Sequence, residues 1–201
     1  MNANERRVVV NTSLSIDGSY IGPGGPQDFG WAMPYVTLDI SRDHLTRLWE
    51  PATTTLLGRT NAEGFMSYWP TVADQADADP RDRAYGAWLR DVEKVVLSST
   101  LREAPWERTR VFDEPAEDVV DRLKTEEGGD IVVFASASVI KALLAADRVD
   151  RLSLIVFPEI LGGGARLFEV GLPSTTWKLA ATATDEHGVI SLAYDRLRDA
   201  A

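Results

Sequence analysis

The chain has 201 residues, 44% of them hydrophobic, and 31 acidic residues against 21 basic ones give a formal net charge of −10. This length favours a single domain over residues 1–201, and the acidic balance argues against nucleic acid or an anionic membrane as a partner, because both are bound through basic patches. The sequence has no cysteine and only two histidines, His44 and His187, so we expect no disulfide, no thiolate chemistry and no metal centre.

The first half of the chain alternates strand and helix patterns around one long loop. Residues 6–16 are rich in β-branched side chains and predict the first strand. Residues 17–34 hold too many glycines and prolines for regular structure, and loops of that length are usually functional. The polar, acidic residues 70–82 predict a surface excursion. Between these segments we expect helices over 39–50, 59–69 and 83–92 and a short strand over 52–58.

The second half repeats the alternation and ends in a hairpin. Amphipathic patterns predict helices over 116–129 and 136–147, the second with Ser136 as its N-cap. Residues 176–197 read as two strands around the turn "DEHG", which predicts an antiparallel pair. Apolar runs predict strands over 93–100, 109–115 and 130–135, and a strand that leads into a glycine-rich turn over 151–168.

This order of elements predicts a three-layer α/β fold. Strands that alternate with helices form a mainly parallel sheet covered on both faces, and the C-terminal hairpin makes the sheet mixed. Ligands of such sheets bind beyond the carboxyl ends of the strands. The segments that fall at those ends are Asp17, 58–60, 98–100, 135–136 and 162–164.

Gly58, Arg59 and Thr60 stand between a predicted strand and a predicted helix. The glycine lets a ligand approach the backbone, and the helix start offers unpaired amides and a positive dipole to phosphate. The arginine adds a fork of donors. The alternative interpretation is a plain turn with a surface arginine.

Two further small-residue segments have the same double interpretation. Residues 135–138 place small and hydroxyl side chains at a helix start, which is also what a simple serine cap looks like. Residues 162–164 are three consecutive glycines, either a flexible turn or a place where a ligand passes close to the backbone. Neither segment completes the Gly-x-Gly-x-x-Gly pattern of the dinucleotide-binding fold.

Asp17 ends the first strand and precedes a glycine. The carboxylate of an Asp-Gly pair often caps its own turn. The functional alternative is a partly buried acid that passes a proton, with a pKa raised by desolvation. The residues alone leave both interpretations open.

The motifs together resemble the dihydrofolate reductase-like superfamily, and most closely the reductase domain of the bifunctional deaminase-reductase of riboflavin biosynthesis. The resemblance runs from Arg7 to Leu197. It implies an NADPH-dependent reductase fold and a homodimer. We expect the deaminase half to be absent, because its zinc site needs cysteine. The segments that carry the resemblance are "SIDG" (15–18), "LLGRTNAEGFMSYWP" (56–70), "KVVLSST" (94–100), "VVFASASVIKALL" (132–144) and "VDRLSLIVFPEILGGGARLF" (149–168).

The resemblance also implies roles for particular residues. Residues 58–60 would hold phosphate, 98–100 would lie near the adenosine ribose and its 2′-phosphate, and 135–138 with 162–164 would line the pyrophosphate and nicotinamide side. Similar proteins often have arginine at the position of Ser99 and glycine at that of Ala135. The cofactor-binding residues implied are Gly58, Arg59, Thr60, Ser98, Ser99, Thr100, Ala135, Ser136, Ala137, Ser138, Gly162, Gly163 and Gly164.

The implied reaction is hydride transfer from NADPH to a substrate beside Asp17. The resemblance implies that Asp17 is the catalytic residue, which faces the substrate and assists protonation or orients the heterocycle. The substrate residues expected with it are Ser15, Phe29, Trp31 and Phe65. The family reaction is reduction of 5-amino-6-(5-phosphoribosylamino)uracil, although residues 18–34 contain no lysine or arginine to meet its phosphate. The alternatives are a reductase of dihydrofolate, a pterin or another heterocycle, and a non-catalytic binding protein on the same fold. With no apolar signal core or membrane-length segment, we expect a cytoplasmic protein.

Overall fold

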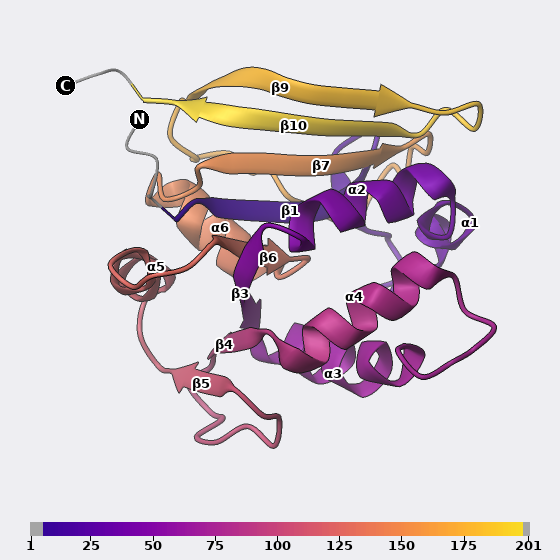
Figure 1. Cartoon of the computed structure of the whole chain (residues 1–201). Coiled ribbons are helices and arrows are strands. Elements are labelled where there is room, and N and C mark those ends of the chain that lie inside the picture. The colour runs from indigo at the N-terminus through magenta and orange to yellow at the C-terminus, as the bar shows by residue number, and fades with distance from the viewer. Residues whose placement is uncertain (1–5, 199–201) are drawn as a thin grey trace.

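A computed structural model describes residues 6–198 and shows a large sheet between two layers of helices (Figure 1). The strands are β1 (Val8–Ser15), β2 (Ser19–Ile21), β3 (Ala52–Gly58), β4 (Glu93–Leu97), β5 (Thr109–Phe112), β6 (Asp130–Phe134), β7 (Arg151–Phe157), β8 (Ala165–Arg166), β9 (Thr176–Thr184) and β10 (Ile190–Leu197). The helices are η1 (Gly30–Ala32), α1 (Met33–Val36), α2 (Asp39–Trp49), α3 (Arg59–Val72), α4 (Pro80–Asp91), α5 (Ala116–Lys124) and α6 (Ala137–Ala145).

The main sheet has eight strands in the order β5-β4-β3-β6-β1-β7-β10-β9. All the pairs from β5 through β7 are parallel, whereas β10 pairs antiparallel with both β7 and β9. A second, two-stranded sheet joins β2 to β8. The predicted three-layer α/β fold, with a mainly parallel mixed sheet and a C-terminal antiparallel hairpin, is confirmed.

Alternate residues of each central strand pack on opposite faces of the sheet, as the period of two requires. In β6, Ile131 and Val133 belong to the cluster covered by α5 and α6. Val132 and Phe134 belong to the other cluster, which is covered by α2, α3 and α4. Figure 1 shows these two groups of helices on the two sides of the sheet. The buried strands are therefore apolar on both faces, which is typical of parallel sheets.

Two segments predicted to be irregular contain regular structure. The loop expected over 17–34 includes β2, η1 and the start of α1. The surface excursion expected over 70–82 is wrong at both ends, because α3 runs through Pro70 to Val72 and α4 begins at Pro80. Val72 is 3% exposed, so tertiary burial holds the last turn of α3 despite the proline. Proline at the first position of α4 is compatible with a helix start.

Ion pairs fasten the start of α4 to α2. Asp79 caps α4 by accepting the Arg81 amide at 2.9 Å. The Arg81 guanidinium donates to Asp79, Asp39 and Asp43. The hydrogen bonds from Arg81 hold the pKa of Asp79 well below its ordinary value. The acidic residues Asp79 and Asp82, which lie in the predicted surface excursion, are therefore ion-paired.

Two structural features are absent from the described residues, 6–198. None of the helices in that range combines the length and the apolar character needed to cross a bilayer. The same range contains no group of three or more histidine, aspartate or glutamate side chains arranged to hold a metal ion.

Candidate functional site

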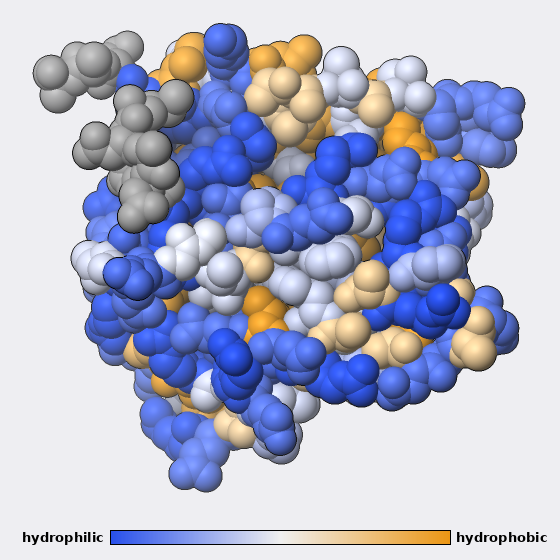
Figure 2. Space-filling model, in the orientation of Figure 1, coloured by the Kyte–Doolittle hydropathy of each residue, from blue (hydrophilic) through white to orange (hydrophobic). Residues whose placement is uncertain are grey.

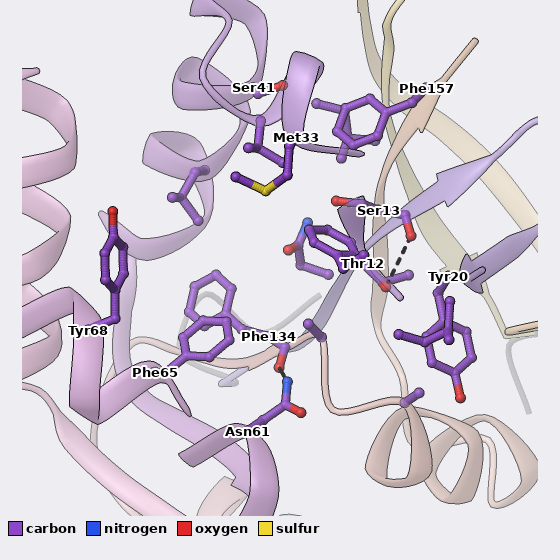
Figure 3. A pocket seen from close by; sticks show the side chains of 18 of the residues that line it. Thr12, Ser13, Tyr20, Met33, Ser41, Asn61, Phe65, Tyr68, Phe134 and Phe157 are labelled. Atoms are coloured by element: carbon purple, nitrogen blue, oxygen red, sulfur yellow. Dashed lines mark hydrogen bonds between the residues drawn. The ribbon is translucent and has the colours of Figure 1, made fainter. Parts of the chain in front are cut away.

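A pocket of about 1130 Å³ opens at the carboxyl ends of β1, β6 and β7. The helices α1, α2, α3 and α4 form its other side (Figure 3). Ligand pockets in proteins commonly measure roughly 300 to 1,000 Å³. The pocket is therefore large enough for a substrate together with part of a cofactor, and it lies where the topology of the sheet predicts a ligand.

Aromatic side chains form the floor of the pocket. The rings of Phe65 and Phe134 are stacked, with centroids 6.2 Å apart, and Figure 3 shows them next to Asn61. Phe134 is 1% exposed and also meets Tyr85 edge to face at 5.6 Å. Tyr68 of α3 lies at one side of the cavity in Figure 3. Phe65 and Tyr68 therefore offer flat surfaces against which a planar ring packs, and the buried Phe134 supports Phe65 from behind.

A buried polar group lies behind this wall. His44 is 4% exposed, and its ring contacts the Asn11 amide at 2.8 Å and the Ser191 hydroxyl at 2.7 Å. Burial and, to a smaller extent, the nearby charge of Arg47 lower the pKa of His44 to about 3. The imidazole is therefore neutral at physiological pH and has no proton to give as an imidazolium acid.

The starts of α3 and α6 meet at one corner of the pocket. The Gly58 amide donates to the Ser136 hydroxyl at 3.0 Å, which joins the two helix starts. The predicted N-cap position of Ser136 before α6 is confirmed, but its hydroxyl makes no cap hydrogen bond and instead accepts the Gly58 amide. Two helix N-termini side by side are suited to bind negatively charged groups.

The residues around this corner differ in how they face the pocket. Ala135, Ala137 and Ser138 line it, whereas the side chain of Arg59 is about half exposed and reaches Glu63 only at 3.4 Å. Thr60 is exposed on the first turn of α3. Ala135 has φ +48°, a left-handed conformation that favours glycine. The backbone at this corner thus holds an unfavourable conformation next to the pocket.

The Ser98–Thr100 segment lies one strand away. Gly58 and Leu97 are register partners in β3 and β4, so Ser98 directly follows the same edge of the sheet. The Ser98 hydroxyl accepts the amides of Thr100 and Leu101, which fixes the turn, and Ser99 is exposed. This segment does not line the large pocket among the described residues, but it extends the edge on which Arg59 lies.

Asp17 is half-buried, as expected, but its pKa is not raised. Its carboxylate accepts the Ser15 hydroxyl at 2.6 Å and the amides of Leu161 and Gly162 at 3.1 Å each. The Ser15 hydrogen bond, followed by the Leu161 amide, lowers the pKa of Asp17. The expected rise is wrong because these donors stabilise the charged form. Asp17 is also not one of the described residues that line the pocket.

The expected substrate residues separate into two groups. Phe29 and Phe65 line the pocket. Ser15 is 2% exposed and is used to hold the turn around Asp17 and Ser19, so the structure does not place it in the pocket wall. Trp31 packs edge to face on Phe29, and the expectation that it lines the site is not met among the described lining residues.

The three glycines after β7 lie at one side of the pocket, and one of them lines it. Gly164 lines the pocket, has φ +86°, and lies so close to Ile21 that an added Cβ would be 2.0 Å from the Ile21 carbonyl oxygen. Gly163 accepts the Ser19 hydroxyl through its carbonyl at 3.1 Å, and Gly162 donates to Asp17. Of the three, only Gly164 is a described lining residue of the pocket.

Several pocket residues lay outside the sequence-based prediction. Asn11 and Ser13 are polar residues that follow three consecutive valines in the first strand, and that change was an available signal. Arg42, Tyr68 and Asp82 belong to helices whose exposed and buried positions look ordinary in sequence. Their common location depends on how α2, α3 and α4 pack, which the local pattern does not encode.

The comparison with known proteins decides the family. The model of the RibD C-terminal domain family matches residues 6–191. The chain belongs to the RibD C-terminal domain family. An uncharacterized protein of Bacillus subtilis (strain 168), YyaP, is 27% identical over 195 residues and is matched over 96% of both chains. The match to the family model therefore covers both helix layers and the sheet up to the start of β10.

Two solved structures with low identity share the fold of this RibD C-terminal domain. A pyrimidine reductase-like protein from Corynebacterium diphtheriae is similar at a TM-score of 0.65 and 19% identity, over 98% of this chain and 94% of that one. Dihydrofolate reductase from Enterococcus faecalis, complexed with NADP(H), is similar at 0.59 and 19% identity, over 96% and 97%. The dihydrofolate reductase-like fold is confirmed, and the family supports an oxidoreductase of the riboflavin-pathway type.

Proposed function

We propose that this RibD C-terminal domain is an NADPH-dependent reductase that transfers hydride to a small heterocycle in the large pocket. The observation that carries this proposal is the position of the pocket, which has an aromatic floor and two adjoining helix starts at the carboxyl end of the sheet. We also propose that residues 1–201 act as one cytoplasmic domain without nucleic acid or a membrane as partner.

The residues at the helix starts fit a dinucleotide cofactor. The Arg59 side chain is half exposed. A Cβ atom added at Gly58 would have the Val139 side chain as its nearest neighbour, 3.6 Å away. Arg59 and Thr60 would hold phosphate. The Ser98–Thr100 segment would lie near the adenosine ribose and its 2′-phosphate. Residues 135–138 with 162–164 would line the pyrophosphate and nicotinamide side. When bound, the nicotinamide supplies the hydride.

Asp17 then acts as a positioning residue. Its carboxylate holds the Leu161 and Gly162 amides, and two residues later Gly164 lines the pocket. The pKa of Asp17 is lowered, so the carboxylate stays charged throughout the neutral range and keeps both bonds. In this account Asp17 sets the shape of the pocket wall without transferring a proton.

A homodimer is part of the proposal. The strand β9 lies at the edge of the sheet, and Leu179, Ile190 and Leu197 on β9 and β10 are each more than one third exposed. Figure 2 shows hydrophobic side chains among hydrophilic ones along the upper edge, over these two strands. An open strand edge with exposed aliphatic residues supports pairing with a second copy.

Substitution of Arg59 tests the cofactor site. We expect Arg59→Ala to weaken NADPH binding by about tenfold, because a charge-assisted hydrogen bond to phosphate contributes about 1.5–3 kcal/mol. Quenching of tryptophan fluorescence during titration with NADPH, and separately with NADH, measures the affinities. Arg90→Ala, which removes an exposed arginine paired with Asp74, is the matched control and should bind NADPH like the wild type. Failure of the wild type to bind either cofactor would contradict the proposed function.

A further inference from the structure

We propose that the substrate is an uncharged, planar heterocycle that carries no phosphate group. This inference rests on the proposed reductase function and specifies the substrate class of the same pocket. It departs from the family reaction, whose substrate is a phosphoribosyl compound. Four features of the pocket carry it: its charges, the surroundings of its arginine, its aromatic surfaces and the location of its helix starts.

The pocket wall has almost no charge. Of the described lining residues, Arg42 and Asp82 are the ones charged at neutral pH, since His44 is buried and neutral. Phosphate groups are bound by arginine, lysine or helix N-termini. Among these residues, Arg42 is thus the one cationic side chain that a substrate phosphate could bind.

The Arg42 guanidinium is already occupied. Its Nε donates to Asp82 Oδ2 at 2.9 Å, its Nη1 lies 3.6 Å from Asp79 Oδ2, and it also donates to the Thr37 carbonyl. The Arg42 and Asp82 side chains are 19% and 18% exposed, so the pair is largely shielded from water. A phosphate that approached Arg42 would meet two carboxylates, and that like-charge contact opposes binding.

The remaining wall suits a flat and neutral molecule. Phe65 is half-buried and Met33 is 56% exposed, and Figure 3 shows them across the cavity from one another. The rings of Phe134 and Phe157 are buried behind this surface, and Phe134 stacks on Phe65. Polar contacts come from amides and hydroxyls, as in Asn61, which donates to the Phe134 carbonyl at 3.4 Å. Such groups donate to and accept from the edge of a heterocycle without requiring charge on it.

The helix starts do not change this conclusion. The starts of α3 and α6 are joined by the bond from Gly58 to Ser136, at the corner next to Arg59. In the proposed function that corner holds the phosphates of the cofactor. A substrate lying over the aromatic floor, on the side of α1 and α2, therefore meets the neutral wall and the Arg42–Asp82 pair.

A pair of ligands that differ only in phosphate tests the inference. Wild-type protein is first titrated with NADPH, which reports on the proposed function by itself. Isothermal titration of the NADPH-loaded protein then compares 5-amino-6-ribosylaminouracil with its 5′-phosphate, and 7,8-dihydropterin serves as a second neutral probe. We expect at least one of the two neutral probes to bind. If the neutral uracil binds, its affinity should be at least about tenfold higher than that of its phosphate ester.

Two outcomes would overturn the inference while NADPH binding stands. One is equal or tighter binding of the phosphate ester, and the other is binding of neither neutral probe. Loss of NADPH binding in the first titration would instead count against the proposed function. If NADPH does not bind, the three probes are titrated without it, and the same comparison applies.

A variant of the ion pair tests the assigned cause. Asp82→Asn removes the carboxylate nearest to Arg42, so we expect the affinity for the phosphate ester to rise at least about fivefold. Affinity for the neutral probes should stay within about twofold. Asp43→Asn is the matched control, because Asp43 is an exposed acid on α2 that pairs with Arg81 and not with Arg42. An unchanged affinity of Asp82→Asn for the phosphate ester would contradict the role given to the ion pair.

Discussion

Phe134→Ala is expected to lower the free energy of unfolding by about 3–5 kcal/mol, the usual cost of truncating a buried phenylalanine. The ring is 1% exposed and contacts Phe65, Tyr85 and Trp88, with centroids 6.2, 5.6 and 6.0 Å away. These neighbours come from α3 and α4, so the cavity left by the ring would separate both helices from the sheet. Chemical denaturation followed by tryptophan fluorescence measures the change.

Phe112→Ala is the control for this prediction. Phe112 lies on the edge strand β5, is half-buried, and packs beneath the guanidinium of Arg122 at 5.1 Å. The same truncation there should cost less, about 1–2 kcal/mol, because less apolar surface is lost. Equal losses in the two variants would show that Phe134 does not anchor the helices of the pocket.

Gly164→Ala is expected to damage the pocket as well as the stability. The added Cβ would lie 2.0 Å from the Ile21 oxygen and 2.7 Å from the Gly22 carbonyl carbon, and both atoms are backbone. The β2–β8 pair must therefore move, at a cost of about 1–3 kcal/mol beyond the strain of φ +86°. Because Ile21, Gly22 and Gly164 all line the pocket, NADPH affinity should fall by about tenfold or more.

Gly162→Ala separates crowding from backbone strain. Gly162 also has a positive φ, +66°, but no atom lies within 4 Å of an added Cβ. Its alanine variant should lose only the roughly 1–2 kcal/mol of the left-handed conformation. Comparison of denaturation midpoints and of NADPH titrations tests both variants. Identical behaviour would mean that the close approach of Gly164 to Ile21 does not shape the pocket.

The layers of the fold were predictable because each strand and helix shows its own period. The α2 helix and β3 were expected over 39–50 and 52–58 and lie at Asp39–Trp49 and Ala52–Gly58. The end of α3 was not predictable from the sequence, because Pro70 is a local stop signal, whereas the burial of Val72 is a tertiary effect. At the end of α3, tertiary packing therefore outweighs the local helix propensity.

The site was predictable in place but only partly in residues. Parallel strand ends must meet at one edge, so Gly58, Ala135 and Gly164 were assigned to the edge of the sheet from sequence alone. The state of Asp17 was not predictable, because it depends on amides of Leu161 and Gly162, which are distant in sequence. The neutralised Arg42 likewise requires α4 to lie against α2.

A crystal structure of the protein in complex with NADPH tests the central claim most directly. We predict the nicotinamide ring inside the large pocket, beside Phe65 and Ala135, with the phosphates at the joined starts of α3 and α6 near Arg59. The aromatic floor toward Met33 should stay open for the substrate. A cofactor bound elsewhere on the molecule, or a nicotinamide ring outside this pocket, would contradict the account.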